Sequence, residues 1–352
     1  CWEYLEIFAG GGVWADSQGQ WAALALTDVG HGRWASWQWR SLAPILNDLA
    51  RKIIPHYAWD DIVLPDDTKE QLREMCAFVE HRHQVYDLWG FDKKLAMGKG
   101  LMALFAGNSG TGKTMASDVI AATLSLDLYK IDLSTVVSKY IGETEKNLKT
   151  IFNEAESSNA ILFFDEADAL FGKRSEVKDA HDRYANIETA YLLQKMEEYS
   201  GAVILASNLK MNLDDAFLRR MHFVIDFEMP DETQRLRIWR STVPPEMPLG
   251  SDVDFVFLAR QFRFAGGNIR NICLAAAFLA ADDRSDVRMS HFIRAVRREY
   301  QKLGKMVTDA DFGPYRGLLE TRSFGKAAHQ QSANMNMSVK TLAAGASEWR
   351  DG

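Results

Sequence analysis

The segment that most constrains the fold is a glycine-rich loop that ends in Lys-Thr. It reads Gly107-Asn108-Ser109-Gly110-Thr111-Gly112-Lys113-Thr114. It follows the apolar run 101–105 and precedes a helical pattern over 114–124. Glycines let successive backbone N–H groups curl around an anion, where a Cβ would interfere. A strand, this loop and a helix whose N-terminus points at the same anion together predict a phosphate-binding loop.

The last two residues of the loop have predicted roles in binding a nucleoside triphosphate with its metal. Lys113 is expected to neutralise the β- and γ-phosphates, and the Thr114 hydroxyl is expected to ligate Mg²⁺. The alternative is an accidental glycine-rich turn. That alternative is disfavoured because every fixed position of the motif is present between a strand and a helix.

The composition narrows the classes of protein to which the chain can belong. Its 352 residues are 47% apolar and 25% charged, as in a globular protein of about two domains. The net charge of −7 disfavours binding to nucleic acid. No apolar run is long enough to cross a bilayer. Three cysteines without metal-ligand spacing favour reduced thiols and a cytoplasmic location.

Four regions are predicted along the chain. Residues 1–55 are expected to be a tryptophan-rich segment that ends in a linker helix over 42–54. The chain begins with Cys rather than Met, which leaves open whether this segment is truncated. The tryptophans suit either a binding surface or a small packed subdomain, and the second is favoured. Residues 56–231 are predicted to be an α/β domain, residues 232–304 a small all-α lid, and residues 305–352 a largely disordered tail.

Apolar strands alternate with helices through the α/β domain. The predicted strands are 101–106, 128–132, 161–165, 202–207 and 223–227. The predicted helices are 67–84, 114–124, 143–157 and 185–199. Continuous apolar strands separated by helices favour a parallel sheet that is covered on both faces. Ligands of such sheets bind at the carboxyl ends of the strands.

Polar residues follow two of these strands. Asp165 and Glu166 come directly after four apolar residues, and Asn208 follows the strand at 202–207. Asp165 is expected to hold Mg²⁺ through water, and Glu166 to deprotonate the attacking water. Asn208 is expected to bind that water and the γ-phosphate. Acids after a strand can simply cap a helix, but the phosphate loop upstream makes that alternative weak.

Further on, Arg219 and Arg220 follow Leu213-Asp214-Asp215-Ala216-Phe217-Leu218. With this segment the chain resembles the AAA+ ATPases over roughly residues 59–303. The resemblance implies a P-loop NTPase sheet with a helical lid, ATP and Mg²⁺ as ligands, and a ring that is usually a hexamer. It also implies that an arginine reaches the site of the neighbouring subunit, with Arg220 slightly preferred over Arg219. A local ion pair is the alternative for one of them.

The same family suggests four more sites. Tyr140, Ile141 and Gly142 resemble the loop that lines the central pore and grips an extended polypeptide, although Tyr140 could instead pack on its own subunit. Asp61, Ile62 and Val63 match the segment that covers adenine. Gly266 and Gly267 mark close approach of the lid backbone to the nucleotide. Asn268, rather than Arg270, falls nearest the expected position of a second sensor, which leaves an arginine sensor open.

A closer resemblance is to the ATPases encoded beside bacterial extracellular contractile injection systems. It is carried by three segments, 59–65, 171–186 and 266–272. It implies a bacterial cytoplasmic role in the assembly, loading or turnover of phage-tail-like particles, with a particle component as protein substrate. His181, Asp182 and Arg183 suit either a second pore loop or a solvated charged loop.

The expected activity is Mg²⁺-dependent hydrolysis of ATP that drives remodelling or threading of a polypeptide. A nucleotide-gated assembly scaffold that binds ATP and threads nothing is the alternative. A nucleic-acid motor is disfavoured by the net charge and by the apolar pore triplet.

Overall fold

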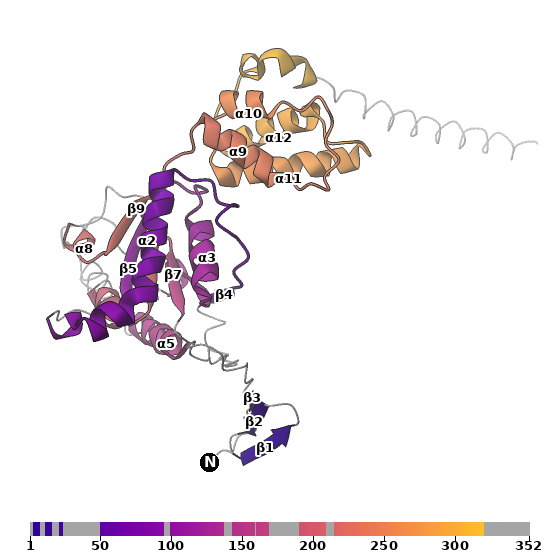
Figure 1. Ribbon diagram of the computed structural model, residues 1–352. Coiled ribbons are helices and arrows are strands. Elements are labelled where there is room, and N and C mark those ends of the chain that lie inside the picture. Colours follow the sequence, from indigo (N-terminus) through magenta and orange to yellow (C-terminus); the bar gives the residue numbers. More distant parts are fainter. Residues whose placement is uncertain are drawn as a thin grey trace, which may run out of the picture. The chain divides into compact units, whose positions relative to one another are not determined.

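The computed structural model describes residues 3–7, 11–15, 21–23, 50–94, 99–136, 143–158, 160–168, 190–208 and 215–319 (Figure 1). The chain divides into two compact units. The first comprises Cys1–Tyr57, Gln71–Phe105 and Ser117–Ile225, and the second comprises Ala58–Glu70, Ala106–Ala116 and Asp226–Gly352. The units do not follow the domain boundary expected near residue 231, because the second unit contains both the phosphate loop and the C-terminal helices.

A six-stranded sheet has the order β4-β6-β7-β8-β5-β9. Its strands are β4 (Arg51–Ile53), β5 (Leu101–Ala106), β6 (Leu128–Asp132), β7 (Ile161–Asp165), β8 (Ala202–Ser207) and β9 (Phe223–Asp226). The predictions for β5 to β8 are confirmed to the residue, and β9 ends one residue earlier than predicted. β6, β7 and β8 pair in parallel, as predicted, so the sheet is mostly parallel.

Burial explains why these strands were visible in the sequence. Every residue of β5 and β8 is buried, and in β7 only the terminal Asp165 is partly exposed. A strand covered on both faces needs an unbroken apolar run rather than an alternating one.

Helices flank this sheet (Figure 1). They are α2 (Asp66–His83), α3 (Lys113–Leu124), α5 (Glu143–Ser158) and a helix over 190–198, with the short α4 (Leu133–Val136) and α8 (Asp215–Leu218). A π-helical turn, Gln84–Leu88, and a 3-10 turn, Phe91–Lys93, follow α2. Leu148 and Phe152 of α5 share a buried core with Phe164 of β7. The helices predicted over 67–84, 114–124 and 143–157 are confirmed to within one residue at each end.

The predicted linker helix over 42–54 is wrong at its end, because Arg51–Ile53 form β4. This strand pairs antiparallel with β6, and Lys52 Nζ lies 2.6 Å from Asp127 Oδ2. Just beyond it, the backbone N–H groups of His56 and Tyr57 donate to the buried Asp118 on α3, at 2.9 and 3.0 Å. Pairing with distant residues therefore overrides the local helical pattern.

In the second unit, four helices form a small all-α bundle. They are α9 (Glu232–Thr242), α10 (Phe255–Gln261), α11 (Gly266–Asp282) and α12 (Met289–Lys302). A capping box starts α9, since Asp231 Oδ1 accepts from the Gln234 N–H at 2.7 Å. Trp239, Phe262 and Phe292 lie in the bundle core.

The prediction of a disordered tail from residue 305 is wrong for its first part. Asp309–Leu319 form 3-10 turns, and Phe312 is fully buried among the helices of the bundle. Tyr315 packs edge-on against Phe257, with 4.8 Å between ring centroids. Gly313 and Pro314 interrupt the helical periodicity here, so the sequence pattern did not predict an ordered segment. Residues 320–352 lie outside the described part.

The tryptophan-rich start contains three short strands, β1 (Glu3–Ile7), β2 (Gly11–Ala15) and β3 (Trp21–Ala23). They form a separate antiparallel sheet in the order β1-β2-β3. Within the described part of the chain, no helix has both the length and the apolar character that a membrane span requires.

Candidate functional site

The glycine-rich loop leaves β5 in a conformation that other residues rarely adopt. Gly107, Gly110 and Gly112 have φ values of 150°, 81° and 109°. A Cβ at Gly107 would overlap the carbonyl oxygen of Phe227. The Phe227 N–H in turn donates to the Ala106 carbonyl at 2.6 Å. The loop shape is therefore fixed by backbone geometry and by a close neighbour on the strand side.

Two side chains tie the loop to itself. Lys113 Nζ donates to the carbonyl oxygens of Gly107 and Asn108, at 2.5 and 3.1 Å. The Thr111 hydroxyl donates to the same Asn108 carbonyl at 2.8 Å. Lys113 is 8% exposed. Its ammonium is thus held at the centre of the loop, where a bound phosphate chain would need a positive charge. Ser109 and Thr114 complete the predicted loop.

The first residues of α11 touch this loop by backbone alone. The Gly267 N–H donates to the Gly110 carbonyl at 2.9 Å. A Cβ on Gly267 would lie 3.0 Å from the Gly110 Cα, whereas one on Gly266 would meet nothing closer than 3.5 Å. The expected close approach of the lid backbone is therefore made to the phosphate loop itself.

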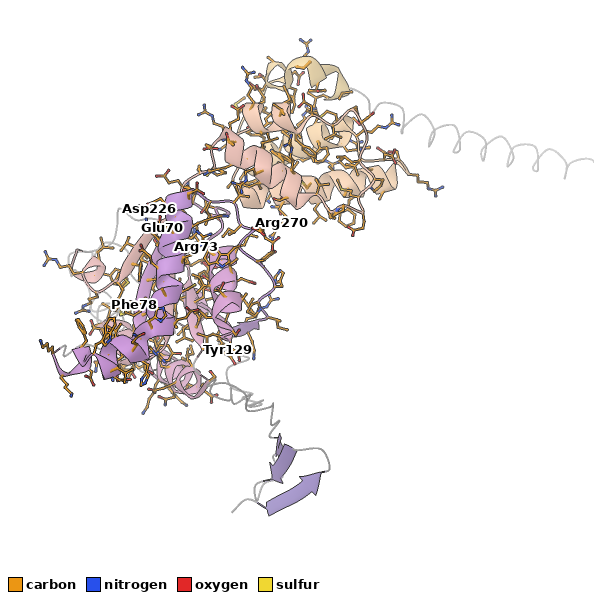
Figure 2. The ribbon with its side chains drawn as sticks, in the orientation of Figure 1. Glu70, Arg73, Phe78, Tyr129, Asp226 and Arg270 are labelled. Carbon is orange, nitrogen blue, oxygen red and sulfur yellow. The ribbon has the colours of Figure 1, made fainter. Side chains whose placement is uncertain are left out.

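The two sensor candidates on α11 have different surroundings. Asn268 Nδ2 donates to the buried Glu299 on α12 at 2.8 Å. Arg270 is exposed on the same helix (Figure 2). Asn268 therefore links α11 to α12, and which of the two residues acts as a second sensor stays open.

The segment expected to cover adenine is a tight turn. The Asp61 N–H donates to the Ala58 carbonyl at 3.1 Å, and the Ala58 N–H donates to Asp61 Oδ2 at 2.8 Å. Ile62 is 2% exposed as a whole residue, so the turn is anchored in the protein core. The adenine-covering role of Asp61, Ile62 and Val63 stays a prediction.

The acids after β7 lie in a constrained turn. Glu166 has a φ of 54°, which is uncommon for a residue with a side chain and recurs at functional sites. Asp165 Oδ1 accepts from the Glu166 N–H at 3.0 Å, and Asp165 Oδ2 lies 2.6 Å from Lys130 Nζ. The Glu166 side chain is exposed, so it is available to a substrate water.

Asp168 joins this turn to the end of β8, a role that the sequence did not reveal. Its carboxylate accepts from the Ser207 hydroxyl and, at 3.1 Å, from the Asn208 N–H. The Ala167 N–H also donates to the Ala206 carbonyl at 2.9 Å. The backbone of Asn208 is therefore fixed relative to Glu166. The signal that could have found Asp168 is its place three residues after Asp165.

The predicted Mg²⁺ ligands have suitable chemistry. The Thr114 hydroxyl and the Asp165 carboxylate offer the oxygen atoms that Mg²⁺ prefers. In the described part of the chain, no cluster of three or more His, Cys, Asp or Glu could hold a metal by itself.

The two arginines after α8 differ in their partners. Arg220 Nε lies 3.0 Å from Glu197 Oε1 in the same subunit. Arg219 is exposed and forms no ion pair with any residue that the structure describes. The local ion pair considered from the sequence is thus made by Arg220, and the choice between the two arginines for an intersubunit role stays a prediction.

The next residue but one, His222, anchors this arginine pair to the sheet. Its Nδ1 accepts from the Met102 N–H at 3.1 Å, and its ring lies 5.1 Å from that of Phe78 on α2 (Figure 2). Burial lowers the pKa of His222. The ring is therefore neutral at pH 7 and packs as an uncharged group.

Several predicted sites lie outside the described residues. They are the pore triplet Tyr140, Ile141 and Gly142 and the charged loop at His181, Asp182 and Arg183.

Comparison with known proteins gives one family match. Residues 103–229 match the family described as "ATPase family associated with various cellular activities (AAA)". This range contains the phosphate loop, both acids, Asn208 and both arginines.

Curated relatives extend the similarity. The chain is 30% identical over 270 residues to the probable 26S proteasome regulatory subunit 6B of Caenorhabditis elegans, covering 74% of this chain and 63% of that protein. It is 29% identical over 287 residues to a katanin p60 ATPase-containing protein of Danio rerio, covering 76% and 56%. It is 27% identical over 286 residues to the cell division protein C of Sulfolobus acidocaldarius, covering 79% and 70%. The chain thus spans less than two thirds of the first two relatives.

Proposed function

Because the chain contains an AAA ATPase domain, we propose that it hydrolyses ATP with Mg²⁺ as a ring of identical subunits and uses the energy to remodel a protein. The observation that carries the hydrolytic step is the constrained turn at Glu166. It presents an exposed carboxylate one residue after the strand that ends in Asp165.

The reaction is ATP + H₂O → ADP + phosphate. Backbone N–H groups of the loop and the Lys113 ammonium bind the phosphates. Glu166 takes a proton from a water molecule while the oxygen of that water attacks the γ-phosphorus of ATP, and ADP leaves. Thr114 and Asp165 would hold Mg²⁺, which would offset charge on the phosphates. Asn208 orients the water, and Arg219 of a neighbouring copy offsets the charge that develops on the transferred group.

A protein substrate is supported by the relatives and by the pore triplet. The similar proteins include a katanin and a proteasome regulatory subunit. An aromatic and an aliphatic residue at Tyr140 and Ile141 can grip a polypeptide without reading its sequence. The closer resemblance carried by residues 59–65, 171–186 and 266–272 favours a component of a contractile injection particle as the substrate, in the bacterial cytoplasm.

The ATPase proposal is tested with Glu166→Gln. This change keeps the size of the side chain but removes the base, so ATP binding should persist while turnover falls about a hundredfold or more. A fluorescent ATP analogue measures binding, and phosphate release measures turnover. Lys113→Ala is the matched control, since it should lose binding as well. Normal turnover in Glu166→Gln would contradict the assignment.

The remodelling step has a separate test. Tyr140→Ala should reduce unfolding of a co-expressed particle protein far more than it reduces phosphate release. If processing is unchanged, the chain is better described as a nucleotide-gated scaffold.

A further inference from the structure

We propose that Lys130 is a positioning residue of the ATP site that acts as the counter-cation of Asp165 and thereby sets the Mg²⁺ requirement of the enzyme. This inference rests on the proposed ATPase function. Lys130 lies on β6, one residue after Tyr129, which is labelled in Figure 2. Nothing in the loop motif or in the acid motif includes it.

Contacts on the Asp165 carboxylate are the first support. Its Oδ2 lies 2.6 Å from Lys130 Nζ, and its Oδ1 accepts from the Glu166 N–H at 3.0 Å. Each oxygen thus has one partner, and together the partners fix the plane of the carboxylate. The same carboxylate shapes the turn that carries Glu166. Lys130 therefore acts on the base through Asp165.

The register of the sheet gives a second, independent support. In the parallel pairing of β6 with β7, Asp132 lies opposite Asp165. Neighbouring strands are about 4.8 Å apart, so two carboxylates project from adjacent positions of the same face. Lys130 precedes Asp132 by two residues and projects from that face as well, because side chains alternate along a strand. Its positive charge therefore offsets the repulsion between two acids that would otherwise destabilise each other.

The consequence for metal binding follows from charge. A cation near Asp165 lowers the negative potential that attracts Mg²⁺. The side chains of Lys130 and Asp165 are 33% and 27% exposed, so this interaction is partly shielded from water. Removing the lysine charge should make Mg²⁺ bind more tightly, while the turn at Glu166 loses one of its fixed points.

The experiment compares four versions of the full chain. They are the wild type, Lys130→Met, Lys130→Arg and Lys52→Met. Lys52, on the edge strand β4, is the matched control. Its Nζ also lies 2.6 Å from a carboxylate oxygen, Oδ2 of Asp127. Binding of a fluorescent, non-hydrolysable ATP analogue is titrated with Mg²⁺, and phosphate release is measured in parallel.

For Lys130→Met, we expect the half-saturating Mg²⁺ concentration in the binding titration to fall about tenfold. We also expect kcat to fall several-fold. Lys130→Arg and Lys52→Met should follow the wild type in both measurements. Thermal stability should fall slightly for Lys130→Met, because Asp132 and Asp165 lose their counter-charge. It should stay near the wild type for Lys130→Arg, which keeps the charge, and for Lys52→Met, whose ion pair is more exposed.

Two results would overturn the inference. One is an unchanged Mg²⁺ titration in Lys130→Met, and the other is an equal shift in Lys52→Met. Failure of the wild type to bind the analogue at any Mg²⁺ concentration would instead reject the proposed ATPase function, so the two failures are distinguishable.

Discussion

The phosphate loop and the acid turn after β7 are held in place by different means. The loop depends mainly on backbone, through glycines with positive φ, a close carbonyl at Phe227 and a backbone hydrogen bond from Gly267. The acid turn has one backbone hydrogen bond to β8 but depends mainly on side chains, because Lys130 contacts Asp165 and Asp168 bonds the end of β8. Substitutions in the loop should therefore damage its shape, whereas substitutions around the acids should alter rates and leave the shape intact.

The largest effect is expected for Gly107→Ala. The new Cβ would overlap the Phe227 carbonyl oxygen in a backbone conformation that alanine rarely adopts. We expect a loss of about 3 kcal/mol in the free energy of unfolding together with loss of ATP binding. Urea unfolding and an ATP-binding titration measure the two effects. A stable variant that binds ATP normally would show that the loop is not fixed by its backbone.

A smaller effect, confined to turnover, is expected for Asp168→Ala. The Ser207 hydroxyl and the Asn208 N–H would lose their acceptor, so Asn208 would be less well oriented. We expect kcat to fall about tenfold, with a loss of stability of about 1 kcal/mol and little change in ATP affinity. Steady-state phosphate release with a parallel binding titration checks this. A large loss of ATP affinity would contradict the separation between loop and acid turn.

The smallest effect is expected for Gly267→Ala. A Cβ there would come within 3.0 Å of the Gly110 Cα and push the loop by a few tenths of an ångström. The KM for ATP should rise about threefold to tenfold, with a loss of about 1 kcal/mol in stability. Gly266→Ala is the matched control, since its Cβ has room and alanine favours a helix. Equal KM values in the two variants would show that the contact does not matter.

Much of the sheet could be predicted because each buried parallel strand is a continuous apolar run. The loop and Glu166 could be predicted because phosphate binding and proton transfer restrict the residue types at fixed spacing. The assignments of single residues to roles in catalysis stay predictions.

Other features depend on contacts between residues far apart in sequence. β4 forms because residues 51–53 pair with β6, and three residues are too few to show a strand pattern. In the sequence nothing distinguishes Lys130 from other strand lysines, and its contact with Asp165 follows only from the pairing of β6 with β7. The ion pair of Arg220 with Glu197 likewise joins residues far apart in the sequence, so the sequence could not reveal this partner.

The hydrogen bond between the Gly267 N–H and the Gly110 carbonyl also bears on how such a protein can diverge. Backbone atoms make it, so among side-chain replacements at Gly267 only proline removes the donor outright. The exposed surface of α11, including Arg270, can therefore change between lineages without breaking this link to the phosphate loop. The contacts that the surface of α11 makes with other molecules can therefore change during evolution, while the hydrogen bond between α11 and the phosphate loop is kept.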